Sequence, residues 1–79
     1  MRRNNLDICA DILRVSRSGA KKTHLVYRAN LNFNIVKKYL NELISNDLLE
    51  NNGEMFFLTD KGAKFIERYD ALVKPLEKM

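Results

Sequence analysis

Residues 23–46, THLVYRANLNFNIVKKYLNELISN, contain the signals of two short helices joined by a tight turn. Thr23 is the expected N-cap of the first helix, which should end near Asn30, a residue that tolerates left-handed turn geometry. Asn32 is the expected N-cap of the second helix, over about residues 33–46. Two helices separated by about three residues, the second of them well capped, follow the helix-turn-helix plan.

The segments on either side of this motif extend the plan. Apolar residues at helical spacing predict a first helix over about residues 6–17. Its expected inward face consists of Leu6, Ile8, Cys9, Ile12 and Leu13. Lys21 and Lys22 follow in a linker that could hold a very short strand. Asn52-Gly53 between two apolar runs predicts a β-hairpin, because both central residues of a type I′ turn need positive φ.

The C-terminal segment reads as one more helix. Thr59 is its expected N-cap, and Pro75 should stop or kink it near Lys74. The order helix, helix, helix, hairpin, helix predicts a mainly α fold with a small β-hairpin, the winged helix-turn-helix. Within a single domain, residues 1–59 would form the winged core and residues 60–79 the C-terminal helix.

Length and composition narrow the classes of protein to which the chain can belong. Its 79 residues, 46% of them hydrophobic and 30% charged, suit one globular domain. A single Cys excludes an internal disulfide and a multi-cysteine zinc site. No apolar run approaches the roughly 18 residues of a membrane span, and no signal-peptide core is present. We therefore expect a cytoplasmic protein.

The charge is polarised along the chain. Residues 1–38 carry nine Lys or Arg and two acids, a net +7, whereas residues 39–79 carry five Lys or Arg and eight acids, a net −3. This asymmetry favours a polyanion such as nucleic acid as the partner of the first half. A merely solvated basic face would produce the same pattern.

The helix expected over residues 33–46 carries one polar stripe. With about 100° between successive residues, its apolar side chains fill half of the cylinder and polar ones fill the opposite arc. In angular order this arc holds Lys37, Asn41, Asn34, Ser45 and Lys38. Amide, hydroxyl and ammonium groups are the ones that contact base edges and phosphates in the major groove of DNA. An ordinary solvated helix face would usually contain more Glu.

Further candidate contacts with DNA precede or follow this helix. Lys21, Lys22, Thr23 and Arg28 lie beside the helix that crosses the DNA backbone in such motifs, although they could serve only solubility. Arg2 and Arg3 resemble a basic arm that enters a minor groove. The tip of the hairpin carries no positive charge, so the wing is expected to contribute little.

The C-terminal helix offers an expected dimer interface. Phe65, Tyr69, Leu72 and Leu76 are spaced 4, 3 and 4 residues apart, which is the interval of a coiled-coil seam. With Val73 they predict a homodimer that presents two recognition helices to two half-sites. The alternative is that Phe65, Ile66 and Tyr69 close the core of their own domain.

Catalytic and cofactor sites are not expected. The sequence has no glycine-rich phosphate loop and no nucleophile paired with its lone histidine, His24, and Cys9 reads as a core residue. The leading interpretation is a double-stranded DNA-binding protein, either a transcription regulator or an architectural protein. The alternative is a winged-helix module that binds other proteins, which an exposed ring at Phe56 or Phe57 would support.

Two segments resemble a known family. Residues 27–33, YRANLNF, with Tyr39-Leu40 and Leu43 resemble the helix-turn-helix of small archaeal winged-helix DNA-binding proteins. Residues 58–62, LTDKG, resemble the wing-to-helix signature of many winged-helix regulators. The resemblance implies a chromatin-associated protein or a transcription regulator, and dimerisation through the C-terminal helix.

Overall fold

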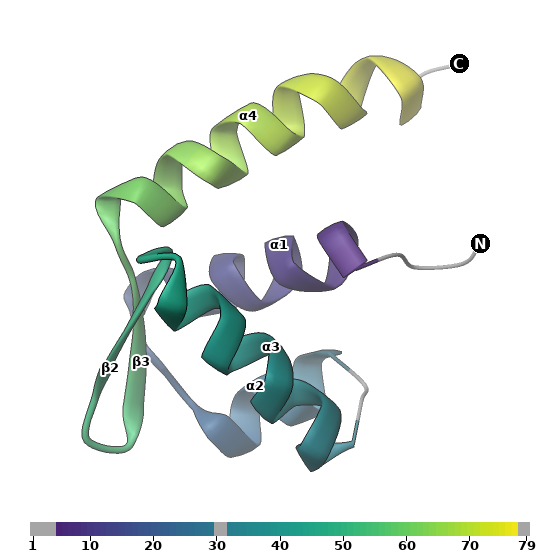
Figure 1. Cartoon of the computed structure of the whole chain (residues 1–79). Helices are drawn as coiled ribbons and strands as arrows, with labels where there is room; N and C mark the ends of the chain where they lie inside the picture. Colours follow the sequence, from purple (N-terminus) through teal and green to yellow (C-terminus); the bar gives the residue numbers. More distant parts are fainter. Residues whose placement is uncertain (1–4, 30–31, 78–79) are drawn as a thin grey trace.

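The computed structural model describes residues 5–29 and 32–77, whose elements follow the expected order. Four helices and a small antiparallel sheet form the winged helix-turn-helix fold that the sequence predicts (Figure 1). In chain order the elements are α1 (Asn5–Val15), the short 3₁₀ turn η1 (Ser16–Ser18), β1 (Ala20–Lys21), α2 (Lys22–Ala29), α3 (Phe33–Ser45), β2 (Leu49–Asn52), β3 (Met55–Leu58) and α4 (Asp60–Glu77).

The sheet joins the linker to the wing. Its strand order is β1-β3-β2, with both pairs antiparallel. The two-residue strand β1 aligns Ala20 with Phe56 and Lys21 with Met55, so the expected short strand is confirmed. Because β1 leads directly into α2, this pairing fixes the start of α2 beside the wing.

The turn of the hairpin lies one residue later than the sequence suggested. Asn52 pairs with Met55, so Gly53 and Glu54 form the two-residue turn. Only Gly53 of these two has positive φ, at 64°. A type II′ turn needs glycine only at its first central position, whereas type I′ needs positive φ at both. The expected Asn52-Gly53 turn is therefore wrong by one position, because Gly53 alone meets the backbone requirement.

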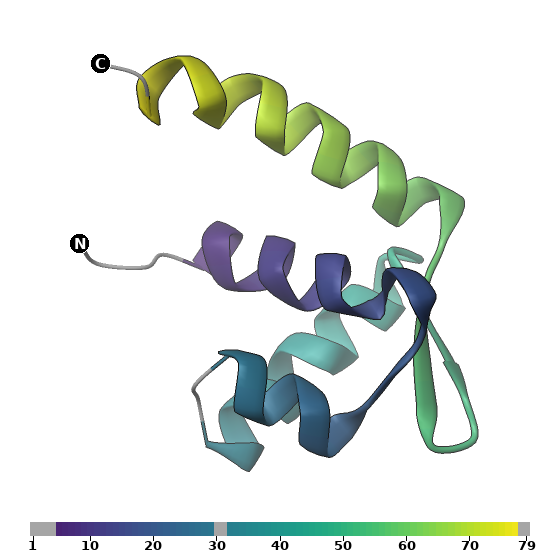
Figure 2. The ribbon, with the colours of Figure 1, turned by 180° about the vertical axis from the view of Figure 1, so that it is seen from behind.

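Helix α1 forms the centre of the hydrophobic core. Figures 1 and 2 show it between α4 on one side and the α2–α3 pair on the other, with the start of α1 and the end of α4 on the same side of the molecule. The fully buried large side chains come from every helix and from the wing: Ile12, Leu13, Leu25, Val36, Leu40, Leu49 and Ile66. Leu6, expected in this face, is 55% exposed, because the first turn of α1 borders an open groove beside α4.

Two of the expected caps are confirmed and one helix start is corrected. Asn32 Oδ1 accepts a hydrogen bond from the Ile35 N–H at 2.9 Å, and Thr59 Oγ1 accepts one from the Gly62 N–H at 3.0 Å. Helix α2 begins at Lys22, so Thr23 lies in its first turn and is not its cap. The sheet holds the backbone in strand geometry only to Lys21, which leaves Lys22 free to start the helix.

Helix α4 continues past the expected stop. It includes Pro75 and ends at Glu77. A proline within a helix removes one hydrogen bond, here the one to the carbonyl of Ala71. Ala71 is exposed, so water can satisfy that carbonyl, and the last turn persists.

Candidate nucleic-acid interface

The polar stripe of α3 is exposed along its whole length. All five of its side chains are exposed, whereas Val36, Leu40 and Leu43 on the opposite face are buried. We call Asn34, Lys37, Lys38, Asn41 and Ser45 the α3 stripe. The structure thus agrees with the arc predicted from the helical period, while contact of these residues with DNA stays a prediction.

Helix α3 is locked at both ends, which fixes the direction of the stripe. The Asn32 cap holds its first turn, and Asn46 at its C-terminus donates from its backbone N–H and its side-chain amide to the Glu42 carbonyl, at 3.1 and 2.8 Å. Asp47 then turns the chain with a φ of 60° and leads into β2. The stripe is therefore presented by a rigid element, as specific recognition requires.

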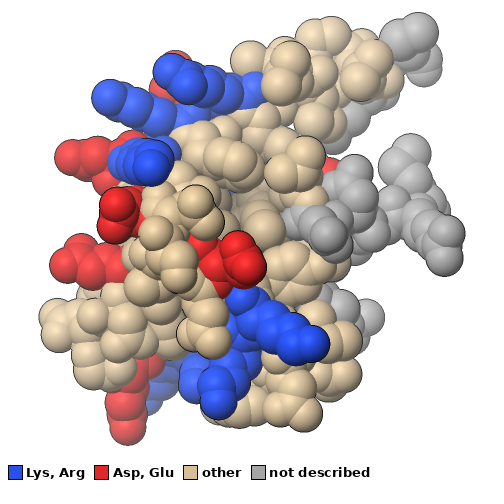
Figure 3. Space-filling model, viewed as in Figure 1, with Lys and Arg blue, Asp and Glu red and all other residues tan. Residues whose placement is uncertain are grey.

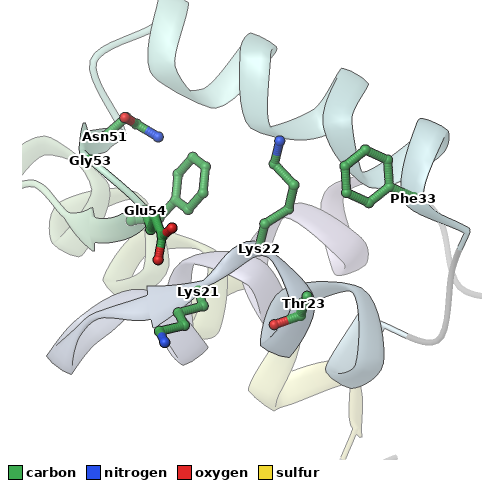
Figure 4. Close-up of a pocket in the computed structure, with 8 residues that line it drawn as sticks. Lys21, Lys22, Thr23, Phe33, Asn51, Gly53 and Glu54 are labelled. Atoms are coloured by element: carbon green, nitrogen blue, oxygen red, sulfur yellow. The ribbon is translucent and has the colours of Figure 1, made fainter.

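Cations from α2 approach the start of α3. Lys21, Thr23 and Arg28 are exposed, and Lys22 is half-buried. The Lys22 ammonium lies 4.8 Å from the ring centroid of Phe33, the first residue of α3. Figure 4 shows Lys22 reaching up from α2 toward α3, with Phe33 on one side and the wing on the other. Lys22 thus links the N-termini of the two helices of the motif.

A hollow separates this pair of helices from the wing. Its lining comes from all three strands, α2, α3 and the wing turn, and includes Phe33, Asn51 and Glu54 (Figure 4). The tip of the wing, residues 51–54, is exposed and carries the Glu54 carboxylate but no cation. Phosphates are therefore disfavoured at the wing side and favoured at the helix side.

The sequence interpretation missed Phe33 as a candidate site residue. The helical period placed it among the inward-facing side chains of α3, yet it is 49% exposed. Ile35, at one edge of the same apolar arc, is 39% exposed, whereas Ile44 at the other edge packs against the core. Phe33 is the first residue of α3 and lies beyond the part of the helix that the core covers. Phe33's position beside the predicted stripe was the signal that could have identified it.

Surface charge separates into distinct regions. Figure 3 shows Lys and Arg gathered over α3 in the lower part of the view and over the first half of α4 in the upper part, with acidic side chains along the left edge. The exposed cations of the first half of α4 are Lys61, Lys64 and Arg68. Arg2 and Arg3, the expected minor-groove arm, lie outside the described residues.

The expected dimer residues fall into two groups. Phe65, Tyr69 and Val73 are half-buried, whereas Leu72 and Leu76 are 74% and 68% exposed. The rings of Phe65 and Tyr69 stack at a centroid distance of 6.5 Å. These two rings also line an open groove, together with Leu6, Leu48 and Leu72. They are therefore not fully covered by their own domain. Figures 1 and 2 both show the second half of α4 extending away from α1.

Contacts within the chain hold α4 against α1. The Arg14 guanidinium lies 5.7 Å from the Tyr69 ring centroid and pairs with the Asp70 carboxylate. Ile66 is buried in the core. Helix α4 is thus anchored through its middle, and its last turns are left uncovered.

Cys9 is half-buried rather than fully buried as expected. Burial raises the pKa of the Cys9 thiol above its usual range, and the negative charge of Glu42 raises it further. The thiol therefore stays protonated near neutral pH, which is the state of an unreactive cysteine.

The described residues form neither a metal-binding cluster nor a membrane span. Within residues 5–29 and 32–77, no three His, Cys, Asp or Glu side chains gather closely enough to hold a metal ion. Over the same part of the chain, no helix is both long and apolar enough to cross a bilayer.

Comparison with known proteins finds similarity over nearly the whole chain. Residues 2–77 match the family described as winged helix-turn-helix. An uncharacterized protein of Methanocaldococcus jannaschii is 34% identical over 79 residues, which cover 99% of this chain and 78% of that protein. A second uncharacterized protein of the same organism is 27% identical, and the match covers 94% of this chain but only 36% of that longer protein.

A solved structure has the same arrangement of elements. It is the crystal structure of Sso10a-2, a DNA-binding protein from Sulfolobus solfataricus. It superposes with a TM-score of 0.82 and 25% sequence identity, over 96% of this chain and 84% of that one.

Proposed function

Since the chain belongs to the winged helix-turn-helix family, we propose that it binds double-stranded DNA with α3 in the major groove, as a transcription regulator or an architectural protein. The α3 stripe is the observation that carries this proposal. It is a row of exposed amide, hydroxyl and ammonium groups on a capped helix. The Sulfolobus protein, whose fold this chain shares, is a DNA-binding protein, which supports the same function.

The dimensions of α3 suit a major groove. An α-helix with its side chains is about 10–12 Å wide, close to the width of the groove. From Asn34 to Ser45 the stripe extends about 16 Å, or roughly half a turn of duplex. We assign Asn34, Lys37 and Lys38, near the start of the helix, to base edges and adjacent phosphates. Asn41 and Ser45 would contact the groove further along.

Helix α2 would contact the phosphates of the DNA backbone. The first helix of such a motif crosses the phosphates while the second enters the groove. The side chains of Lys21 in β1 and of Thr23 and Arg28 in α2 are exposed. They are our candidates for phosphate contacts. Lys22, which spans to α3, would contribute its charge between the two helices.

A homodimer is part of the proposal. Leu72 and Leu76 expose large apolar side chains on the part of α4 that extends from the body. Such exposure is unfavourable in water unless another surface covers it. A second copy would do so and would present two α3 helices to half-sites related by twofold symmetry.

The competing function, a module that binds only proteins, predicts an apolar patch on α3 or the wing, such as an exposed Phe56 or Phe57 ring. Phe56 is buried, and Phe57 is half-buried with its ring against Gly19. Neither ring offers the exposed surface that this function would use. The wing therefore offers no such patch, whereas α3 exposes Phe33 and Ile35 beside its polar stripe. Measured binding to DNA is what separates the two functions.

The test is fluorescence anisotropy of a labelled random duplex of roughly 30 base pairs, at low and moderate salt. Binding should weaken steeply with salt, because phosphate contacts release counterions. The double variant Lys37→Glu/Lys38→Glu should bind at least about tenfold more weakly and with a shallower salt dependence.

A matched control separates the α3 stripe from net charge. Lys61→Glu/Lys64→Glu makes the same change in charge on α4, and this variant should bind nearly as well as the wild type. Equal losses in both variants would contradict recognition by α3. No binding by the wild type at low salt would contradict the function itself.

A further inference from the structure

We propose that Phe33 reads thymine, by packing its ring on the 5-methyl group that thymine exposes in the major groove. This inference rests on the proposed function, and it adds a base preference that the polar stripe alone does not give. It also assigns a role to an aromatic side chain that the core does not use.

Phe33 is exposed but held in place. It is the first residue of α3, 49% of its surface is exposed, and it does not belong to the cluster of core side chains. The Lys22 ammonium lies 4.8 Å from the ring centroid, which places one face of the ring against a cation. A cation–π contact at an exposed site stabilises by about 0.5–1 kcal/mol. The ring is thus oriented before any partner binds.

The position of Phe33 on α3 points it toward base edges. It precedes Asn34 directly and lies one helical turn before Lys37, both in the α3 stripe. Residues at the start of a recognition helix are the ones that reach base edges. The thymine methyl is the apolar group that the base pairs present in the major groove, and phenylalanine is among the side chains that contact it.

The neighbouring residue favours the same base pairs. Asn34 can donate to N7 and accept from N6 of adenine, so Phe33 and Asn34 together would select A·T pairs. The two are consecutive, so one can meet thymine while the other meets adenine at the same or the next step. The start of α3 is therefore suited to A·T-rich sequence.

Ile35, the other exposed apolar residue of α3, does not share these features. It is 39% exposed, and it lines a different hollow with Lys38, Tyr39 and Glu42. The Glu42 carboxylate there disfavours the approach of phosphates. Ile35 therefore provides a control position with similar chemistry on the same helix.

The experiment compares two duplexes that differ only in methyl groups. One is an alternating A·T duplex, and the other carries uracil in place of every thymine, which removes the methyl and leaves charge and base pairing unchanged. The wild type should bind the thymine duplex about three- to fivefold more tightly, as burial of a methyl group implies. Phe33→Ala should bind both equally, and its affinity for the uracil duplex should match that of the wild type.

Two further variants complete the design. Ile35→Ala should keep the thymine preference, and Phe33→Leu should keep part of it, because leucine retains an apolar surface. Circular dichroism melts verify that each variant is folded.

Each outcome bears on a definite claim. A wild type that binds both duplexes equally, with steep salt dependence, would overturn the role of Phe33 and leave DNA binding in place. A Phe33→Ala variant that keeps the preference would overturn it as well. No binding to either duplex would overturn the proposed function and this inference together.

Discussion

At the scale of single residues, Gly62 shows how tightly α4 packs on the rest of the domain. Its φ is not in the left-handed region, so its backbone does not require glycine. A Cβ at this position would lie 2.2 Å from the Leu48 carbonyl oxygen and 2.7 Å from the Leu58 Cδ1. Real atoms cannot approach so closely, and the nearer one belongs to the backbone. The absence of a side chain is what lets α4 begin against the turn between α3 and β2.

We predict that Gly62→Ala destabilises the protein by about 2 kcal/mol or more, although alanine favours helix formation by about 1 kcal/mol over glycine. Urea unfolding followed by circular dichroism measures this difference. Gly53→Ala is the comparison, because nothing lies within 4 Å of a Cβ there and only its φ of 64° opposes the substitution. A more stable Gly62→Ala protein would show that α4 does not pack as closely as described.

Residues at the edges of elements set the limit of what the sequence reveals. Asn32 was predictable as a cap because its chemistry is local: an amide oxygen and an N–H three residues later. Phe33 and Leu6 were not predictable as exposed, because helical period gives direction but not the extent of the surface that covers it. The helical period placed Phe33 on the inward face of α3 because it is apolar. For that reason the sequence interpretation did not consider it as a site residue.

At the scale of elements, the joint between α3, the wing and α4 depends on Thr59. Its hydroxyl donates to the Asp47 carbonyl at 2.6 Å and accepts from the Gly62 N–H at 3.0 Å. One side chain thus caps α4 and ties it to the turn that ends α3. Because these bonds link two elements, their loss should affect the whole domain rather than one helix end.

We predict that Thr59→Ala costs about 1–2 kcal/mol of stability, since it removes an N-cap and a second hydrogen bond. Thr59→Ser retains the hydroxyl and should cost much less. Chemical denaturation of both variants gives the comparison. Equal losses in the serine and alanine variants would assign the effect to the lost methyl group instead.

The boundaries of elements were harder to predict than their existence. Every helix and the hairpin could be predicted from periodicity and capping residues, and so could the exposed face of α3. The start of α2 depends on the pairing of β1 with β3, which joins residues more than thirty positions apart. Such long-range pairing does not appear in a local pattern, so α2 begins two residues earlier than a cap at Thr23 implies. The turn moved by one residue because Gly53 takes the positive φ that the turn needs. The end of α4 moved because Pro75 leaves only the carbonyl of Ala71 unpaired, and Ala71 is exposed to water.

At the scale of the whole molecule, the two ends of the domain have different surfaces. The side that carries α2 and α3 exposes cations and amides, whereas the far half of α4 exposes leucines. The described part of the chain measures 41 × 26 × 20 Å, and α4 extends along one side of it. This division allows DNA binding and self-association to use separate surfaces, and so to be lost separately.

We predict that Leu72→Asp/Leu76→Asp keeps the proposed homodimer from forming, because carboxylates placed in an apolar interface would lose their hydration without gaining partners. Sedimentation equilibrium at several protein concentrations measures the mass.

Neither leucine is buried in the domain core, so the variant should melt at nearly the temperature of the isolated wild-type subunit. Its affinity for a duplex with two half-sites should fall toward that of one subunit, since linked binding is lost. Lys37→Glu/Lys38→Glu should give the opposite result, a dimer whose binding to DNA is at least about tenfold weaker. A wild type that sediments as a monomer at high concentration would remove the role assigned to α4 and leave that of α3 intact.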